Sequence, residues 1–216
     1  MQSCLAKPQK PTDPRIAFFN HHAHRWDHDA DHQARILKRL DGLREQIGLK
    51  PGQDVLEIGC GTGMITAWLA PCVRPGRVVA VDFSPAMLAE AKAKAIVAEF
   101  CLMDICAEYP LGDSFDLAFC FQAFPHFREP KAALARIAHG LKPGGRLVVL
   151  HLVSRRRINS FHRDVGGAVK EDLLPPAEDW PGLLKDTGLG VSRYEDRPDL
   201  FLMEATRVEA TVGKHP

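Results

Sequence analysis

The sequence lacks a strong net charge and long apolar runs, and each absence excludes a class of protein. With 28 Lys and Arg against 27 Asp and Glu, the 216 residues carry a formal net charge of +1. Such a chain has no field that would concentrate nucleic acid or anionic lipid. No stretch approaches the roughly 20 apolar residues of a membrane span, and the N-terminus lacks the apolar core of a signal peptide. We therefore expect a cytoplasmic protein that binds a small molecule, with no nucleic-acid or membrane partner; the pattern leaves the oligomeric state open.

The sequence also lacks a C-x-x-C pair, the usual mark of a thiol redox or metal site. Several of its six cysteines fall inside apolar runs, where a small buried thiol is the commonest role. They are Cys4, Cys60, Cys72, Cys101, Cys106 and Cys120. This usage indicates a reducing compartment.

Length and composition predict one ordinary globular domain. The chain is shorter than the size at which single cores split, and its 45% apolar and 25% charged residues are those of a soluble protein. We expect disordered tails at 1–14 and 208–216 around a single domain at 15–207, whose first part, 15–49, forms a helical lid.

Apolar strand patterns alternate with helical patterns along most of the chain, which predicts a parallel sheet with crossover helices. Two amphipathic helices are expected first, within 15–28 and 31–49. Strands are expected at 53–59, 76–82, 98–104, 115–121 and 145–152, with helices after most of them. Two further strand-like runs, within 190–206, are joined by a turn too short for a parallel crossover. The prediction is an α/β, Rossmann-like, doubly wound sheet of seven strands, mostly parallel, with an antiparallel last strand.

The first predicted strand runs into a glycine-rich turn, VLEIGCGTGM at 55–64. Glycines there let the backbone approach a ligand closely, and the following helix offers free N–H groups. A dinucleotide fingerprint needs glycine at i, i+2 and i+5. Counting from Gly59 the last position is Met64, and counting from Gly61 it is Thr66, so the nicotinamide interpretation fails.

The pattern E-x-G-x-G-x-G, from Glu57 to Gly63, resembles motif I of the class I S-adenosylmethionine (SAM)-dependent methyltransferases. The resemblance extends from about Arg15 to Arg207, and "LKPGGRLVV" at 141–149 is similar to the family's segment leading into the fifth strand. It implies that SAM is the cofactor and that the glycine turn holds its methionine part. A pocket rich in carboxylates suits a sulfonium cation, whereas it would repel a pyrophosphate.

The resemblance also implies roles for later residues. Asp82 stands where the family accepts both ribose hydroxyls, and Asp104 stands where it meets the adenine amino group. The N-terminal helices are expected to lay aromatic side chains over the cofactor. The complete expected cofactor set is Glu57, Gly59, Cys60, Gly61, Gly63, Asp82, Phe83, Met87, Asp104, Ile105, Phe121, Phe19 and Trp26.

Methyl transfer needs a general base only when the acceptor is protonated, and three histidines near predicted strand ends are candidates for that role. His126 follows the fourth strand, His151 ends the fifth, and His162 lies in the connection after it. Histidine titrates near neutral pH and serves equally as base, donor or filler. Each is therefore a candidate catalytic residue or a structural side chain.

Two other segments invite functional interpretation. The long connection 151–176 is expected to form substrate walls, and its arginines at 155–157 and 163 either bind an anionic acceptor or form a solvated face. In one continuous helix, His24, His28 and His32 would share a face and could chelate a metal. A solvated polar face accounts for these histidines as well, so no metal is expected.

The expected activity is methyl transfer to a small molecule, and the resemblance points to the subgroup with quinone and sterol C-methylases, without fixing O, N, C or S as the acceptor atom. A non-catalytic SAM-binding or regulatory protein is the alternative, because fold does not fix function. Thiol or metalloid methylation and RNA or protein methylation are minor alternatives. The Asn-Pro-Pro-aromatic signature of nucleic-acid and glutamine methylases is absent after the fourth strand, where "CFQAFPHF" stands.

Overall fold

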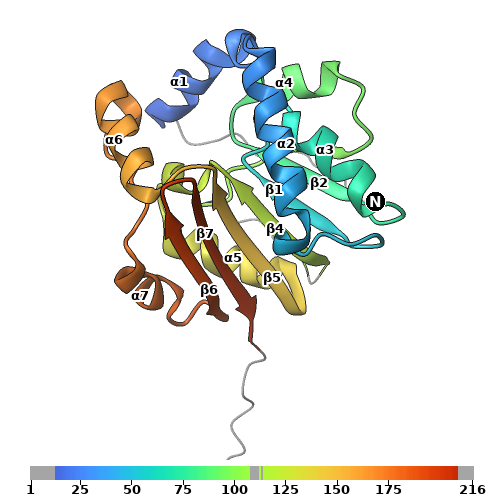
Figure 1. Cartoon of the computed structure of the whole chain (residues 1–216), viewed down its shortest axis with the longest axis vertical. Helices are drawn as coiled ribbons and strands as arrows, with labels where there is room; N and C mark the ends of the chain where they lie inside the picture. The colour runs from blue at the N-terminus through green and yellow to red at the C-terminus, as the bar shows by residue number, and fades with distance from the viewer. Residues whose placement is uncertain (1–12, 108–111, 113, 209–216) are drawn as a thin grey trace, which may run out of the picture.

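The computed structural model describes residues 13–107, 112 and 114–208. Within these residues, seven strands form one sheet in the order β3-β2-β1-β4-β5-β7-β6, flanked by helices on both faces (Figure 1). The expected tails lie largely outside the described residues. The predicted doubly wound α/β fold is confirmed.

The strands run parallel from β3 through β5, and only β7 is antiparallel to its neighbours on both sides. The strands are β1 (Val55–Ile58), β2 (Val78–Asp82), β3 (Glu99–Leu102), β4 (Phe115–Phe121), β5 (Leu141–His151), β6 (Leu189–Arg197) and β7 (Leu200–Arg207). The antiparallel last strand predicted from the short final turn is confirmed.

The helices match the predicted alternation except after β5, where the connection contains an additional helix. They are α1 (Pro14–His22), α2 (Ala30–Ile47), α3 (Met64–Val73), α4 (Pro85–Ala93), α5 (Pro130–Gly140), α6 (Arg155–Val165) and α7 (Trp180–Leu184). Short 3-10 turns are η1 (Ala23–Arg25), η2 (Phe124–His126), η3 (Gly167–Val169) and η4 (Ala177–Asp179).

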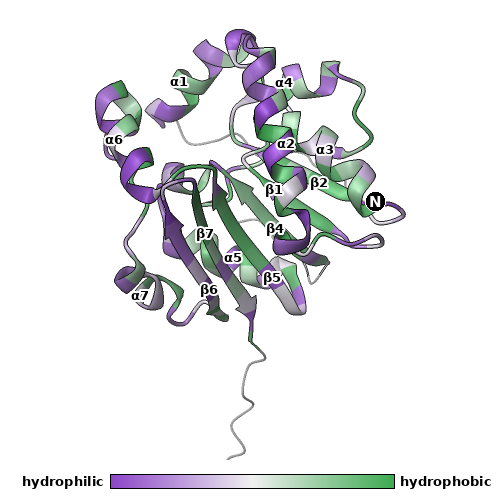
Figure 2. Ribbon diagram, in the orientation of Figure 1, coloured by the Kyte–Doolittle hydropathy of each residue, from purple (hydrophilic) through white to green (hydrophobic). Residues whose placement is uncertain are grey.

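The core forms two layers because successive side chains of a strand point to opposite faces of the sheet. On β4, Leu117 and Phe119 belong to the layer under α2 and α3, whereas Ala118 and Cys120 belong to the layer under α5 and α7. Figure 2 shows the central strands as hydrophobic ribbons, with hydrophilic segments on the outer helices. Strands covered on both faces explain the continuous apolar runs in the sequence.

The order of the strands places a crevice at the ends of β1 and β4. The chain goes from β1 outward to β2 and β3, and then returns to the other side of β1 with β4. At such a reversal the two crossovers leave in opposite directions, and ligands bind beyond the carboxyl ends of the strands. The glycine turn after β1 and the loop after β4 meet there.

The connection after β5 differs from the expected irregular loop, because it contains the helix α6. Ser154 caps this helix by accepting a hydrogen bond from the backbone N–H of Arg157. Ile158, Phe161 and Val165 share one face of this helix, but its other positions are polar or charged, so the segment carries few apolar residues. Arg156, Arg157 and Arg163 are exposed, as expected for a solvated face.

The N-terminal helical segment is also interrupted. The chain leaves the helical path after η1 and begins again at α2, where Asp29 accepts from the N–H of His32 as the N-cap. His24, His28 and His32 therefore do not share one continuous helix face. Within the described residues, no helix combines the length and apolarity that a membrane crossing requires.

Arg146 of β5 joins the end of α2 to the sheet. Its guanidinium pairs with Glu204 of β7 at 3.0 Å and donates to the carbonyls of Ile47 and Gly48 at 3.1 and 3.2 Å. Gly48 ends α2 in the left-handed region, at φ +73°, and a Cβ there would lie 2.4 Å from Arg146 Nη2. Both the backbone conformation and this close approach require glycine.

We expect Gly48→Ala to lower the free energy of unfolding by about 1–2 kcal/mol, because a left-handed conformation is strained for residues with a Cβ. Gly42 provides the matched control, since it lies exposed inside α2 with open space around it. Gly42→Ala should raise the free energy of unfolding by about 0.5–1 kcal/mol. Urea unfolding of both variants measures the difference, and equal effects would contradict the role assigned to Gly48.

Candidate functional site

The glycine turn after β1 is built from three left-handed glycines. Gly59, Gly61 and Gly63 have φ values of +74°, +53° and +83°. A Cβ on Gly59 would lie 2.4 Å from the Cβ of Ala123, which follows β4. Gly59 thus lets β1 and β4 end side by side, whereas the position of a Cβ on Gly61 is open space.

Asp82, at the end of β2, fixes the conformation of this turn. Its Oδ2 accepts from the N–H of Gly61 at 2.8 Å, and its Oδ1 accepts from the N–H of Ser84 at 2.8 Å. Burial raises the pKa of this carboxyl in spite of these hydrogen bonds, which lower it. A buried carboxylate with this energetic cost favours a ligand that brings positive charge or hydroxyl donors.

Glu57 lies beneath the turn and is almost completely buried. Thr66 of α3 donates from Oγ1 to Glu57 Oε2 at 2.6 Å. Burial raises the pKa of Glu57 to about 8, and the neighbouring Asp82 raises it further, while the hydrogen bond from Thr66 lowers it. At neutral pH the protein alone therefore holds Glu57 mainly in its neutral form.

A cavity of about 450 Å³ opens above these residues, a volume common for small-molecule sites. Eleven residues of the expected cofactor set line it, from the turn, from β2, β4 and the N-terminal segment. They are Phe19, Trp26, Gly59, Cys60, Gly61, Asp82, Phe83, Met87, Asp104, Ile105 and Phe121. Glu57 and Gly63 stand behind this lining and support it.

Arg128, which the sequence analysis did not single out, pairs with two carboxylates at the cavity wall. Its guanidinium lies 3.5 Å from Asp104 and 3.8 Å from Asp13. Asp104 also accepts from the N–H of Cys106 at 2.8 Å. The loop after β4 thus contributes a cation to the expected adenine end of the cavity.

The N-terminal segment covers the cavity, and some of its polar side chains bind the glycine turn and the start of α4. Asp27 accepts from Thr62 Oγ1 at 2.8 Å and pairs with Lys94. Asn20 of α1 accepts from Ser84 Oγ at 2.7 Å, next to Asp82. Phe19, at the covering face, contacts the ring of Phe83 edge-on. The segment therefore covers one side of the cavity with Phe19 and Trp26.

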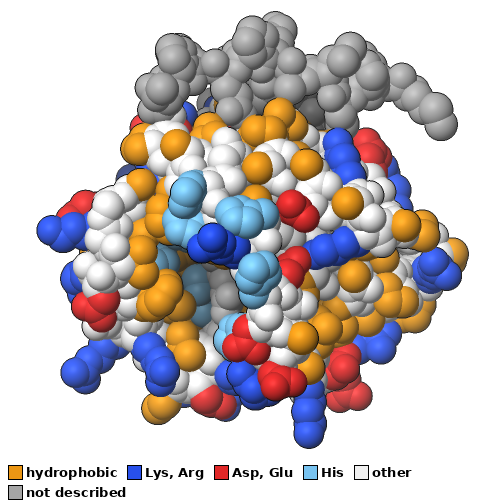
Figure 3. All heavy atoms as spheres, turned by 90° about the horizontal axis from the view of Figure 1, so that it is seen from above, with side chains coloured by type: hydrophobic (Ala, Val, Ile, Leu, Met, Phe, Trp, Pro, Cys, Tyr) orange, Lys and Arg blue, Asp and Glu red, His pale blue; other side chains and the backbone are white. Residues whose placement is uncertain are grey.

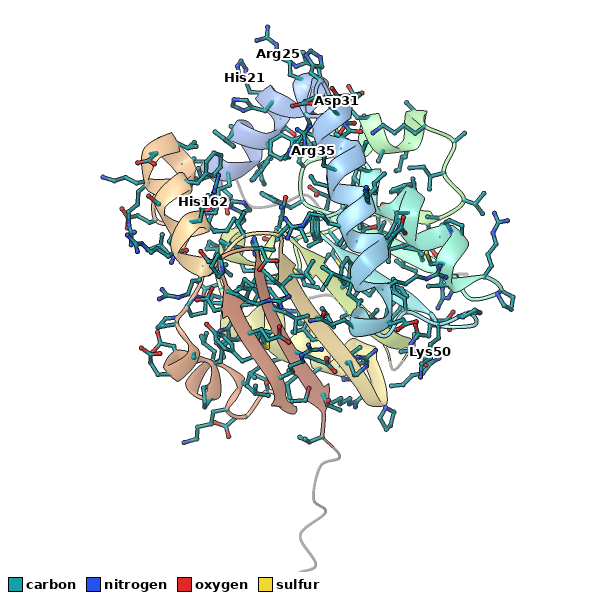
Figure 4. The ribbon with its side chains drawn as sticks, viewed as in Figure 1. His21, Arg25, Asp31, Arg35, Lys50 and His162 are labelled. Carbon is teal, nitrogen blue, oxygen red and sulfur yellow. The ribbon has the colours of Figure 1, made fainter. Side chains whose placement is uncertain are left out.

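The three candidate histidines come together behind the cavity wall. The rings of His126 and His162 are 5.0 Å apart, and His151 is close enough to both for their charges to lower its pKa further. Figure 4 shows His162 on α6, on the side that faces α1. Figure 3 shows other histidine side chains at the surface around a hollow on this end of the molecule. His126 alone of these three lines the cavity.

The three histidines have different environments. His151 is 1% exposed, neither of its nitrogens has a hydrogen-bond partner among the described residues, and burial lowers its pKa to about 3. His162 donates from Nδ1 to the backbone carbonyl of Asp172, and burial lowers the pKa of His162. His126 Nδ1 lies 2.7 Å from Asp172 Oδ2. Asp172 was not anticipated from sequence, because no local motif marks the segment after η3 in which it lies.

The Cys60 thiol and the histidine-rich N-terminal segment were the remaining candidates for chemistry. Burial raises the pKa of the Cys60 thiol, which makes it a poor nucleophile. His21 and Arg25 stand at the outer tip of the N-terminal segment in Figure 4. Across the described ranges, no group of three or more His, Cys, Asp or Glu side chains is arranged to hold a metal ion.

The residues present fit a SAM-like ligand. The carboxyl groups of Asp82 and Asp104 line the cavity, which suits a sulfonium, an ammonium, ribose hydroxyls and an adenine amino group. The first turn of α3 offers N–H groups for a carboxylate. Open space at Gly61 lets the ligand approach the backbone.

Residues 55–145 match a family model described as a methyltransferase domain. The chain is 31% identical over 183 residues to the O-methyltransferase cnsE of Penicillium expansum, covering 76% of this chain and 65% of that protein. The match therefore spans slightly under two thirds of that relative's length. A ubiquinone biosynthesis O-methyltransferase of Alkalilimnicola ehrlichii is 28% identical, covering 88% of this chain and 79% of that protein.

Among solved structures, a SAM-dependent methyltransferase from Aquifex aeolicus has a similar fold. The TM-score is 0.63 at 22% sequence identity, and the match covers 83% of this chain and 99% of that one. A likeness at this identity concerns the fold alone.

The raised pKa of Glu57 predicts a pH-dependent cost to stability. The unfolded state ionises this carboxyl from about pH 4.5 and the folded state only near pH 8, so stability falls between these values and the loss is complete above them. Glu57→Gln removes this loss, which amounts to about 1.4 kcal/mol for each unit by which the pKa is raised. Urea unfolding of both proteins at pH 5 and pH 8.5 measures it. If the free energy of unfolding depends on pH in the same way for the wild-type protein and for Glu57→Gln, Glu57 does not carry the raised pKa.

Proposed function

We propose, since the chain belongs to the class I SAM-dependent methyltransferase family, that it transfers a methyl group from SAM to a small-molecule acceptor. The observation that carries this proposal is the arrangement of Asp82, which orders the glycine turn and faces the cavity at the same time. When bound, SAM supplies a methyl group on a positively charged sulfur. Every other requirement falls to the protein.

The protein's residues have separate tasks in this proposal. Asp82 accepts from the ribose hydroxyls, Asp104 from the adenine amino group, and Glu57 supports the turn that holds the methionine part. Phe19, Phe83 and Met87 exclude water from the cavity and hold the apolar parts of both ligands. Positioning and exclusion of water supply much of the acceleration of a displacement reaction.

A small molecule is the proposed acceptor because the cavity is enclosed by the N-terminal segment and the chain carries almost no net charge. The named relatives include two O-methyltransferases, which supports transfer to oxygen. We place the activity in the cytoplasm, since the buried thiols of Cys60, Cys72, Cys106 and Cys120 suit a reducing compartment. A non-catalytic SAM-binding protein is the alternative.

The decisive experiment incubates the purified protein with methyl-labelled SAM and an extract of its source cells, and then separates small molecules, nucleic acid and protein. We expect label in the small-molecule fraction. Asp82→Ala should abolish most of it and weaken SAM binding in calorimetry by about 1–3 kcal/mol, through loss of hydrogen bonds to a charged group. Glu90→Ala, on the exposed side of α4, is the control. SAM binding without transfer to any fraction would favour the binding-protein alternative.

The attachment of the lid predicts a kinetic effect. Asp27→Ala removes the acceptor for Thr62 and the partner of Lys94, so the N-terminal segment should open more often and the SAM off-rate should rise severalfold. Asp31→Ala removes a carboxylate from the exposed first turn of α2 and should leave the off-rate unchanged. Stopped-flow displacement of bound SAM measures both rates. An unaltered SAM off-rate in Asp27→Ala would show that the N-terminal segment does not control the release of SAM.

A further inference from the structure

His126 and Asp172 form a hydrogen-bonded pair at the inner wall of the cavity. His126 ends η2, directly after β4, and Asp172 lies beyond η3, so the pair joins segments that are 46 residues apart. Their side chains are 14% and 7% exposed. An ionised Asp172 at 2.7 Å from Nδ1 requires the proton of a neutral imidazole to reside on Nδ1. The lone pair is then on Nε2.

Asp172 is held in place by a second contact from the lid. Arg15 of α1 donates from Nη1 to Asp172 Oδ1 at 2.9 Å and to the carbonyl of His126 at 3.4 Å. Each carboxylate oxygen thus has its own partner, and the carboxylate cannot rotate without breaking one of them. Closure of α1 therefore completes the arrangement of the pair.

The second ring nitrogen of His126 remains available. Nε2 has no hydrogen-bond partner among the described residues, and it is not among their buried unpartnered atoms, unlike both nitrogens of His151. Because His126 lines the cavity and is otherwise mostly buried, the accessible edge of the ring belongs to the cavity. Phe19 packs against the ring edge-on, with centroids 5.0 Å apart.

We propose that His126 is the general base of the reaction and that the acceptor is a neutral, mainly apolar molecule with a weakly acidic hydroxyl, a phenol or an enol. This inference rests on the proposed function. Asp172 and Arg15 are positioning residues that fix the tautomer and the orientation of the ring.

The chemical step balances with these groups alone. The hydroxyl proton moves to His126 Nε2 while the acceptor oxygen uses its electron pair to form a bond to the methyl carbon. The bond between that carbon and sulfur breaks, and its electron pair stays on sulfur. The imidazolium afterwards returns its proton to water. A hydroxyl still carries its proton when it binds at neutral pH, so it needs a base inside the site.

The charges around the cavity support a neutral acceptor. Arg128, a cation of the cavity wall, is paired with the carboxylates of Asp13 and Asp104. A carboxylated acceptor would compete with those pairs. Aromatic side chains at the wall, among them Phe121 and Phe127, suit a planar apolar ring.

Charged and titratable groups face His126 from several elements. Asp172 and Asp82 supply negative charge, Arg15 supplies positive charge, and His151 and His162 lie beside the ring. Asp172 compensates the positive charge that the ring gains when it takes the proton. Burial lowers the pKa values of His151 and His162. Neither of these two histidines lines the cavity.

The test uses the full chain, methyl-labelled SAM and the small-molecule fraction of a source-cell extract, with kinetics followed from pH 6 to pH 10. We expect label in a methyl ether, released as methyl iodide by hydriodic acid and stable to mild alkali. His126→Gln should lower the rate at neutral pH by about 10²–10⁴-fold. The loss should shrink as pH rises, since the acceptor then ionises in solution. SAM affinity should stay unchanged.

His139→Gln is the matched control, because His139 is exposed on α5, and it should behave as the wild-type protein. A second readout needs no turnover: nitrogen-15 NMR of the histidine rings should show the His126 proton on Nδ1 in the wild-type protein and lose that signature in Asp172→Asn. His126→Gln leaves the contact between Arg15 and Asp172 intact, so it decides the matter even if Asp172→Asn fails to fold.

The outcomes separate the two proposals. A labelled ether whose rate is unaffected by His126→Gln at every pH overturns the assignment of the base and leaves the proposed function standing. Label on nitrogen, carbon, sulfur or a carboxylate ester overturns the hydroxyl acceptor. No label in any fraction overturns the proposed function, and this inference with it.

Discussion

The carboxylate of Asp82 is the contact on which the rest of the site depends. Its two oxygens accept from the backbone of the turn after β1 and from the start of α4. One side chain therefore sets the spacing between two strand ends and keeps the floor of the cavity open. Since both hydrogen bonds are already made in the protein alone, the turn is pre-organised, and a ligand has less conformational entropy to remove on binding.

The features that were predictable from sequence are those with a local cause. Apolar runs and glycine turns depend on neighbours within a few residues, so the alternation of strands and helices, the antiparallel β7 and the glycine turn were all confirmed. The methyltransferase domain model that matches residues 55–145 agrees with the family that motif I indicated. Eleven residues of the expected cofactor set line the cavity. They lie at the ends of strands, in the segments that follow those strands, or in the N-terminal segment.

The remaining features depend on contacts between distant segments. Asp172, Arg15 and Arg128 have no local motif, and their roles become visible only when α1, the loop after β4 and the segment after η3 meet. The helix α6 was missed because its sequence carries few apolar residues and Ser154 was not recognised as its cap. The condition for a shared histidine face, one continuous helix through His24, His28 and His32, is not met, since Asp29 caps a new helix.

Because β7 runs antiparallel to β5, the last described strand ends on the side of the sheet opposite the cavity. Strands β1 to β5 all end at the edge of the sheet where the cavity lies, but β7 starts at that edge and runs away from it, so Arg207 lies at the opposite end of the sheet (Figure 1). The lid occupies the cavity side. An affinity tag or a fused reporter domain joined after β7 would therefore start from the end of the sheet opposite the cavity, whereas the same addition before α1 would start beside the segment that covers the cavity.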